Sequence, residues 1–319
     1  MKNVYLPEGA LLNTSENQEY ISSISGLERA FIEGKILEST VSFCDSAFRL
    51  HINLNGMLGI MDKEETLFCR AGESPKDIAI ITRVGKPIAF KVIGFRRENG
   101  VIVAVLSRKK AQEECHASYL ASLRPGDIIK ARVTHLENFG AFVDVGCGLS
   151  SLLTVDSISV SRISHPKDRL SIGEEIYVVV KSRDEQSGRL YVSMKELLGT
   201  WEENAREFEV GQTVLGIVRS IEDYGVFIEL APNLAGLAEM RTDTRDFEIA
   251  KVGAHTAVYI KSILPDRMKI KLVLIDTYRG STPQLKHKYF IDCESTSHLS
   301  HWVYSPATAT KLVETVFDD

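Results

Sequence analysis

Two pairs of aromatic residues flank a glycine at the same spacing in two parts of the chain. Phe139 and Phe142 enclose Gly140, and Tyr224 and Phe227 enclose a second glycine. An exposed aromatic ring can stack on the face of any nucleobase, whereas a ring that points inward only fills a core. Residues three apart on a regular strand point to opposite faces, so a bulge at Gly140 is needed to bring Phe139 and Phe142 together on the outside.

The aromatic pairs belong to a long internal repeat. Residues 124–153 align with 209–238 without a gap, and 172–193 align with 252–273 after a connection that is five residues shorter. A weaker copy covers 34–107. A repeat of about 65–75 residues indicates three domains of similar fold.

Within a copy, the hydrophobic pattern is that of short strands. Every second residue from 129 to 133 is apolar, a hairpin turn is expected at 184–188, and β-branched and aromatic residues dominate three further segments. Five short strands in about 70 residues predict a closed barrel of the oligonucleotide-binding (OB) type. The three further segments are 141–145, 176–181 and 189–193.

The segments between the copies have helical patterns, and Thr200 followed by Glu203 fits a capping box. The predicted fold class is therefore all-β: three consecutive five-stranded OB barrels joined by short helical linkers, with a small C-terminal cap. The expected domains are an N-terminal extension (1–33), a divergent barrel (34–108), a helical linker (109–123), a barrel (124–195), a second helical linker (196–208), a barrel (209–275) and a cap or tail (276–319).

The motif that begins at Gly126 resembles the S1-type RNA-binding domain. The sequence reads G-D-x-x-x-A-x-V-x-x-L-x-x-F-G-A-F-V-D and later G-x-L-x-V-S-M-K. The resemblance is close over 124–196, good over 209–275 and visible only in outline over 34–108. The whole chain is similar to a short, three-copy member of the family named after the large mRNA-binding protein of the bacterial small ribosomal subunit.

The resemblance implies an RNA-binding face on the second and third barrels, with aromatic side chains that stack on bases. Thr154 occupies the position of a family histidine and could bond a phosphate, and Asp184 and Arg189 match a family pair at the last hairpin. Lys130, Arg132 and His135 on the first strand either line the same groove or are solvated surface. In the third barrel the implied residues are Tyr224, Phe227 and Lys269.

Departures from the family pattern weaken the expectation of RNA binding for the third and first copies. Glu239 replaces the histidine in the third barrel and would repel a phosphate. In the first copy, an ungapped alignment puts Ala47 and Leu50 at the aromatic positions and Asp62 at the histidine position. A barrel without stacking residues is expected either to dock on a protein or to act as a spacer.

Charge and motif content exclude other classes of function. The net charge is −5, and the three copies carry +3 (11 − 8), +1 (10 − 9) and −1 (8 − 9), which is too little for duplex binding by electrostatics alone and fits single-strand binding. No Walker A, HExxH or GxSxG motif occurs, so we expect neither an enzyme nor a cofactor. Cys293, His298 and His301 have the spacing of metal ligands, but no second cysteine accompanies them, and no metal is expected.

The five scattered cysteines, the absence of an apolar N-terminal stretch and the absence of a long apolar run predict a cytoplasmic protein with free thiols. The favoured hypothesis is single-stranded RNA (mRNA) binding, associated with translation or the ribosome, with residues 1–108 contacting the ribosome or another protein. The alternative is a protein-interaction scaffold of OB barrels that has lost RNA binding. A weaker alternative is an accessory subunit of an enzyme.

Overall fold

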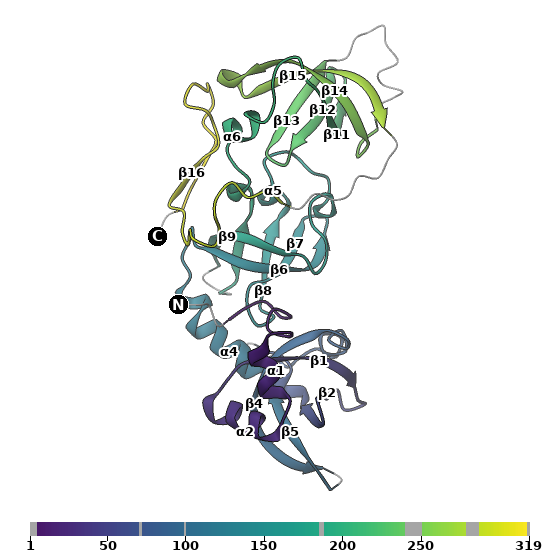
Figure 1. The fold of residues 1–319 in the computed structure, drawn as a ribbon, viewed down its shortest axis with the longest axis vertical. Coiled ribbons are helices and arrows are strands. Elements are labelled where there is room, and N and C mark those ends of the chain that lie inside the picture. The colour runs from purple at the N-terminus through teal and green to yellow at the C-terminus, as the bar shows by residue number, and fades with distance from the viewer. Residues whose placement is uncertain are drawn as a thin grey trace. The chain divides into compact units, whose positions relative to one another are not determined.

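The computed structural model describes residues 5–69, 72–98, 100–184, 188–239, 251–278 and 287–317. These residues contain three closed five-stranded barrels, one after another along the chain (Figure 1). The predicted fold class, tandem all-β barrels of the OB type, is confirmed. The described residues contain no helix that is both long and apolar enough to cross a membrane.

The chain divides into two compact units. The first unit contains residues 1–123 together with 130–132 and 143–151. The second unit contains the remainder of the chain, including the third barrel and the C-terminal segment.

The first barrel is closed by a parallel pairing between its third and fifth strands, in which Gly59 pairs with Ala104. Leu27 and Ala30 of an N-terminal helix are fully buried and join the barrel core. Its strands are β1 (Leu37–Cys44), β2 (Leu50–Leu54), β3 (Met57–Met61), β4 (Pro87–Glu98) and β5 (Val101–Ser107), and its helices are α1 (Ser15–Ile21), α2 (Ile24–Glu33) and α3 (Asp77–Ile81).

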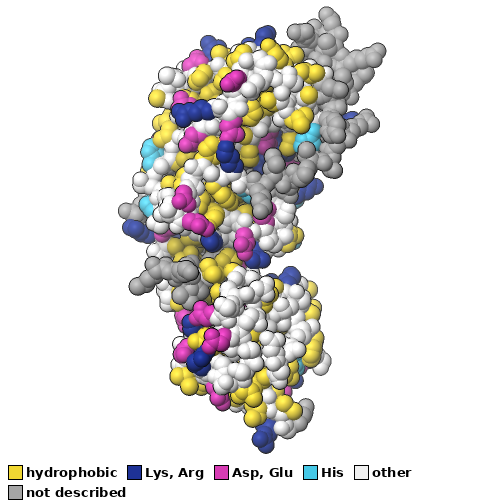
Figure 2. Space-filling model, viewed as in Figure 1, with side chains coloured by type: hydrophobic (Ala, Val, Ile, Leu, Met, Phe, Trp, Pro, Cys, Tyr) yellow, Lys and Arg dark blue, Asp and Glu magenta, His cyan; other side chains and the backbone are white. Residues whose placement is uncertain are grey.

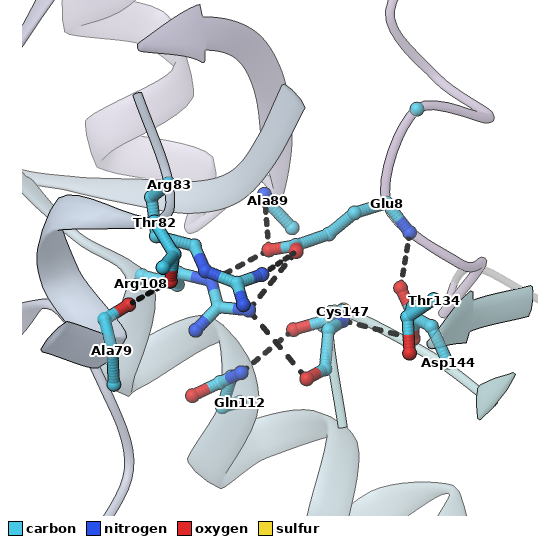
Figure 3. Close-up of polar contacts among 12 residues, drawn as sticks. Glu8, Ala79, Thr82, Arg83, Ala89, Arg108, Gln112, Thr134, Asp144 and Cys147 are labelled. Atoms are coloured by element: carbon cyan, nitrogen blue, oxygen red, sulfur yellow. Dashed lines mark hydrogen bonds and ion pairs between the residues drawn. The ribbon is translucent and has the colours of Figure 1, made fainter. Parts of the chain in front are cut away.

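A buried ion cluster attaches the N-terminal segment within the first unit (Figure 3). The Glu8 carboxylate accepts two hydrogen bonds from the Arg108 guanidinium, at 2.6 and 2.9 Å, and a third from the Ala89 backbone N–H. The Glu8 backbone N–H donates to Asp144 at 2.7 Å. Burial, reinforced by the charge of Glu8, raises the pKa of Asp144 to about 7. A paired arrangement of this kind is what permits charged side chains to be buried.

The second barrel follows the first after a helical linker, as predicted. Its strand order is β10-β8-β7-β6-β9, with β8 and β10 parallel. Part of the predicted hairpin turn, 185–187, lies outside the described residues. The elements are α4 (Arg108–Ser118) in the linker, then β6 (Ile128–Glu137), β7 (Gly140–Asp144), β8 (Ser150–Thr154), α5 (Val155–Ile158), β9 (Glu175–Arg183) and β10 (Leu190–Ser193).

The second linker and the third barrel repeat this plan. The Thr200 side chain accepts from the Glu203 backbone N–H and the Glu203 side chain accepts from the Thr200 N–H, which confirms the predicted capping box. Residues 240–250 of the predicted third domain lie outside the described residues. The elements are α6 (Trp201–Ala205), β11 (Thr213–Glu222), β12 (Gly225–Ala231), β13 (Leu234–Glu239), β14 (His255–Leu264) and β15 (Lys269–Tyr278).

The C-terminal segment, residues 287–317, packs within the second unit and contains the short strands β16 (His301–Val303) and β17 (Glu314–Val316). Trp302 and Tyr304 are buried in the core cluster of the third barrel. Tyr289 and Ile291 instead pack beside Val179 of the second barrel. Residues 279–286 of the predicted cap lie outside the described residues.

Candidate nucleic-acid interface

The structure brings Phe139 and Phe142 together on the surface of the second barrel. Their ring centroids are 6.1 Å apart and the rings are nearly perpendicular, at 89°. Phe139 is 55% exposed and Phe142 is partly exposed. His135 of β6 adds a third ring, 6.4 Å from Phe142 and inclined by 28°. The three rings form a surface on which flat bases can stack.

The two rings meet at the turn before β7, and the bulge predicted at Gly140 stays a prediction. Phe139 lies in the tight turn that precedes β7, so strand alternation does not govern its direction. Gly140 is the first residue of β7, and a Cβ there would lie 2.5 Å from the Leu153 carbonyl oxygen. The glycine is thus required by the close approach of β8. In the third barrel the irregularity lies on β11, between Val218 and Ser220.

Thr154 lies beside Gly140, and the backbone N–H of the next residue donates to the Phe139 carbonyl oxygen at 3.0 Å. Its hydroxyl is 2.9 Å from the Ser157 Oγ, and its hydrogen bond to Asp156 lowers the pKa of that carboxyl. The hydroxyl predicted to meet a phosphate is therefore already engaged locally.

Asp184 and Arg189 are paired through their backbones at the β9–β10 hairpin. The Asp184 N–H donates to the Arg189 carbonyl oxygen at 2.9 Å, and the Arg189 side chain is exposed. Because β10 is parallel to β8, with Tyr191 opposite Leu152, this hairpin lies at the end where β8 begins, and Thr154 lies at the other end of that strand.

The three polar residues predicted along β6 have different surroundings. Lys130 is exposed and His135 is exposed next to Phe142, with its Nε2 2.7 Å from Glu137. Arg132 is half-buried against the N-terminal segment, where a Cβ on Gly9 would lie 3.2 Å from its Nη1. Arg132 therefore packs inside the first unit rather than beside the aromatic rings.

Tyr191 was missed by the sequence reasoning. It is 36% exposed between the buried residues Leu190 and Val192, and it pairs with Leu152 across the parallel β8–β10 ladder. The alternation within 189–193 could have indicated its outward direction, but its neighbour on β8 is far away in the sequence.

The third barrel repeats the aromatic pair. The rings of Tyr224 and Phe227 are 6.2 Å apart at 89°, and Tyr224 is 62% exposed. Lys269 is exposed at the start of β15. The Lys271 ammonium lies 3.1 Å from Glu239 and lowers the pKa of that carboxyl. The negative charge expected to repel a phosphate therefore has a cationic neighbour, which the sequence reasoning also missed.

Strand register corrects the alignment of the first barrel. Phe227 faces Ser220 across β11–β12, and at the equivalent place His51 faces Phe43 across β1–β2. Leu50, assigned to an aromatic position by the ungapped alignment, is fully buried. The turn before β2 is one residue longer than the turn before β12 of the third barrel, and the turn after β2 is one residue shorter than the turn after β12. The two differences cancel, so only β2 is displaced in the ungapped alignment. A one-residue slip exchanges the two faces of a strand.

Aromatic side chains therefore remain on this face of the first barrel. The Phe43 and His51 rings are stacked at 4.3 Å with an angle of 9°, and Phe48, rather than Ala47, occupies the position of Tyr224. Phe43 is 49% exposed.

Carboxylates partner the cations around these rings. Arg96 bonds Asp62 at 2.7 and 3.0 Å and lowers the pKa of that carboxyl. Although burial opposes it, hydrogen bonds from His51 and Arg49 lower the pKa of Asp45. Arg49 and Arg96 also both contact Glu98. The guanidinium groups are thus neutralised within the barrel.

The described residues contain no group of three or more histidines, cysteines or carboxylates suited to a metal ion. His298 lies 2.9 Å from Asp127 and His301 lies 2.7 Å from Glu314, so the two histidines have different carboxylate partners. On the face drawn in Figure 2, lysines and arginines are interspersed with acidic side chains rather than gathered in one patch.

Comparison with known families decides the nature of the second barrel. Residues 122–195 match the S1 RNA binding domain. The barrel is an S1-type domain. This match agrees with the resemblance inferred from the motif that begins at Gly126.

Relatives extend the similarity beyond this barrel. The chain is 36% identical over 161 residues to the small ribosomal subunit protein bS1 of Staphylococcus haemolyticus. The aligned stretch covers 49% of this chain and 40% of that protein. The chain is 30% identical over 213 residues to the protein of the same name from Coxiella burnetii. This aligned stretch covers 64% of this chain and 38% of that protein. The chain thus spans less than half the length of these two relatives.

Among solved structures, a multidomain protein with nucleic acid binding domains from Streptococcus pneumoniae matches over 76% of this chain and 73% of its own, with 13% identity and a TM-score of 0.24. GSP13 from Bacillus subtilis matches over 23% of this chain and 57% of its own, with 26% identity and a TM-score of 0.22.

Proposed function

We propose that the protein binds single-stranded RNA, including mRNA, through its second and third barrels, and that it acts in the cytoplasm in translation, in association with the ribosome. The observation that carries the proposal is the repeated aromatic pair, with ring separations of 6.1 and 6.2 Å and the same perpendicular arrangement. Two surfaces of equal geometry on consecutive barrels suit a ligand with repeating flat groups.

Stacking, rather than charge, supplies most of the proposed affinity. The face of the second barrel offers Phe139, Phe142, His135 and Tyr191, with Arg189 and Lys130 as candidate phosphate contacts. Lys269 and Lys271 have the corresponding role in the third barrel. A duplex hides the faces of its bases, so the near-neutral barrels should prefer single strands.

The test is fluorescence anisotropy with a labelled single strand of about 20 nucleotides and a matching duplex, each at two salt concentrations. Each lost stacking contact costs about 1–3 kcal/mol, so Phe139→Ala/Phe142→Ala together should raise Kd at least about 30-fold. Phe31→Ala is the matched control, because Phe31 is an exposed aromatic residue, 45% accessible, on α2 of the first unit. Equal affinity of the double variant and the control would refute the stacking site.

For residues 1–108 we propose a protein partner, the ribosome in the first instance. The neutralised cations around Phe43 and His51 favour a protein surface over RNA at this barrel. The exposed residues Ile24, Phe31 and Ile32 on α2 offer apolar contact area. A protein that stays wholly in the supernatant when ribosomes are pelleted at low salt would contradict this part.

The second candidate function is a protein-interaction scaffold without RNA binding. The Lys271–Glu239 pair favours it, because that pair removes net positive charge from the face of the third barrel. Under this alternative, Phe139→Ala/Phe142→Ala weakens a protein partner and the wild type binds no RNA at tens of micromolar.

A further inference from the structure

A buried ion cluster joins the second and third barrels within the second unit. The Glu229 carboxylate on β12 accepts from the Arg219 Nε of its own barrel, and its other oxygen lies 2.6 Å from the Arg169 Nη2 of the preceding barrel. The three side chains are only 5%, 9% and 5% exposed. Arg219 also reaches back to Asp168, at 3.6 Å. Burial, with the nearby charge of Glu229 opposing it, lowers the pKa of Arg169.

Backbone contacts reinforce the cluster. The Ser161 N–H donates to the Pro232 carbonyl oxygen at 3.2 Å, and the Val160 N–H donates to the Asn233 Oδ1 at 2.9 Å. The Nδ2 of the same asparagine donates at 2.8 Å to the carbonyl oxygens of Lys195 and Gly199 in the linker. Asn233, fully buried, thus connects three segments of the chain.

The C-terminal segment is bonded to both barrels. On the side of the third barrel, the Tyr304 hydroxyl donates to the Asn233 carbonyl oxygen at 2.6 Å. On the side of the second barrel, the Leu299 N–H donates to the Gly126 carbonyl oxygen at 2.8 Å and the Ile128 N–H donates to the Ser297 carbonyl oxygen at 2.9 Å. The segment therefore acts as a strap across the junction.

Domains joined by a linker alone are expected to move independently, and a large or specifically bonded interface is what prevents this motion. Here the linker, the ion cluster and the strap all oppose separation. Separating the barrels would expose the Arg169–Glu229 pair and the Asn233 contacts.

We infer that the second and third barrels engage RNA as one preorganised body, in which Arg169, Glu229 and Tyr304 are positioning residues that hold the Tyr224–Phe227 pair at a fixed place relative to the Phe139–Phe142 pair. This inference rests on the proposed function. The ligand class is a single strand long enough to cross both barrels. A fixed second site raises the effective concentration for the next stretch of the strand, so affinity should rise steeply at the length that reaches it.

The test uses the full-length chain with Arg169→Gln/Tyr304→Phe. This variant removes the cation from the second barrel and the hydroxyl from the strap, while the Arg219–Glu229 pair inside the third barrel and the Tyr304 ring remain. Arg206→Gln is the matched control, since Arg206 is exposed in the linker region. If the double variant does not fold, Tyr304→Phe alone replaces it.

Two readouts separate positioning from folding. Residual dipolar couplings of backbone amides should fit one alignment tensor for both barrels in the wild type and in Arg206→Gln, and two tensors in the double variant. The ratio of the Kd for a strand of about 5 nucleotides to the Kd for one of about 20 should fall by about tenfold or more in the double variant, with binding of the short strand unchanged.

Two independent alignment tensors in the wild type would overturn the inference. It would also be overturned if the double variant, with barrels that move independently, kept the wild-type ratio of Kd values for short and long strands. Either result would leave RNA binding intact. Absence of RNA binding by the wild type at every length would instead overturn the proposed function, and the inference with it.

Discussion

Glu38 provides a pH-dependent test of how the N-terminal segment is held. Its Oε2 accepts hydrogen bonds from the backbone N–H groups of Gly9 and Leu11, both at 2.9 Å. Its other oxygen is buried and has no hydrogen-bond partner among the residues that the structure describes. Burial, reinforced by the charges of Glu8 and Asp144, raises the pKa of Glu38 from 4.5 to about 7.

The size and sign of the effect follow from this pKa. The folded state holds the Glu38 proton more tightly than the unfolded chain does. The resulting stabilisation is fully present below pH 4.5 and is lost as the pH rises through about 7. The difference between the two values corresponds to about 3 kcal/mol. Glu38→Gln keeps the size of the side chain and cannot ionise, so it should lack this dependence.

Hydrogen exchange of the Gly9 and Leu11 amides, measured by NMR from pH 4.5 to 8 and corrected for the intrinsic exchange rate, reports the local opening. Protection in the wild type should fall relative to Glu38→Gln by about 3 kcal/mol over this range. Asp144 is present in both proteins, so the comparison reports the removal of the Glu38 carboxylate together with its interaction with Asp144. Glu33→Gln, a change at an exposed carboxylate, is the control. If the protection of these amides changed with pH in the same way in the wild type and in Glu38→Gln, the titration of Glu38 would not control the opening of the N-terminal segment.

Three further predictions concern the barrels. Tyr191→Ala should weaken single-strand binding by about 1–3 kcal/mol in anisotropy titrations, because an exposed ring on the strand beside β8 is lost. Unchanged affinity would show that Tyr191 does not stack. Glu239→Gln should free Lys271 for a phosphate contact. RNA binding should then tighten, and the slope of log Kd against log salt concentration should steepen by about 0.7. An unaltered slope would show that Lys271 makes no phosphate contact. Gly140→Ala should destabilise the second barrel by about 1–3 kcal/mol in thermal unfolding, because its Cβ would lie 2.5 Å from the Leu153 carbonyl oxygen, and an unchanged melting temperature would contradict that close approach.

The sequence alone determined the repeated barrels, the helical linkers, the Thr200–Glu203 cap and the positions of the aromatic pairs. These features depend on residues a few positions apart, through strand alternation, helix capping and an ungapped repeat. The meeting of Phe139 and Phe142 was also predicted, although the prediction treated Phe139, a turn residue, as a strand residue.

Tertiary structure alone decided which remote residues lie together. His51 rather than Leu50 stacks on Phe43, because two turns of compensating length displace β2 without changing the total length of the copy. Tyr191 lies beside Leu152 through the parallel β8–β10 ladder, and Arg132 packs against Gly9 of the N-terminal segment. The Arg169–Glu229 pair joins side chains from two different barrels. Such contacts depend on strand register and on packing between distant segments, which local sequence patterns do not encode.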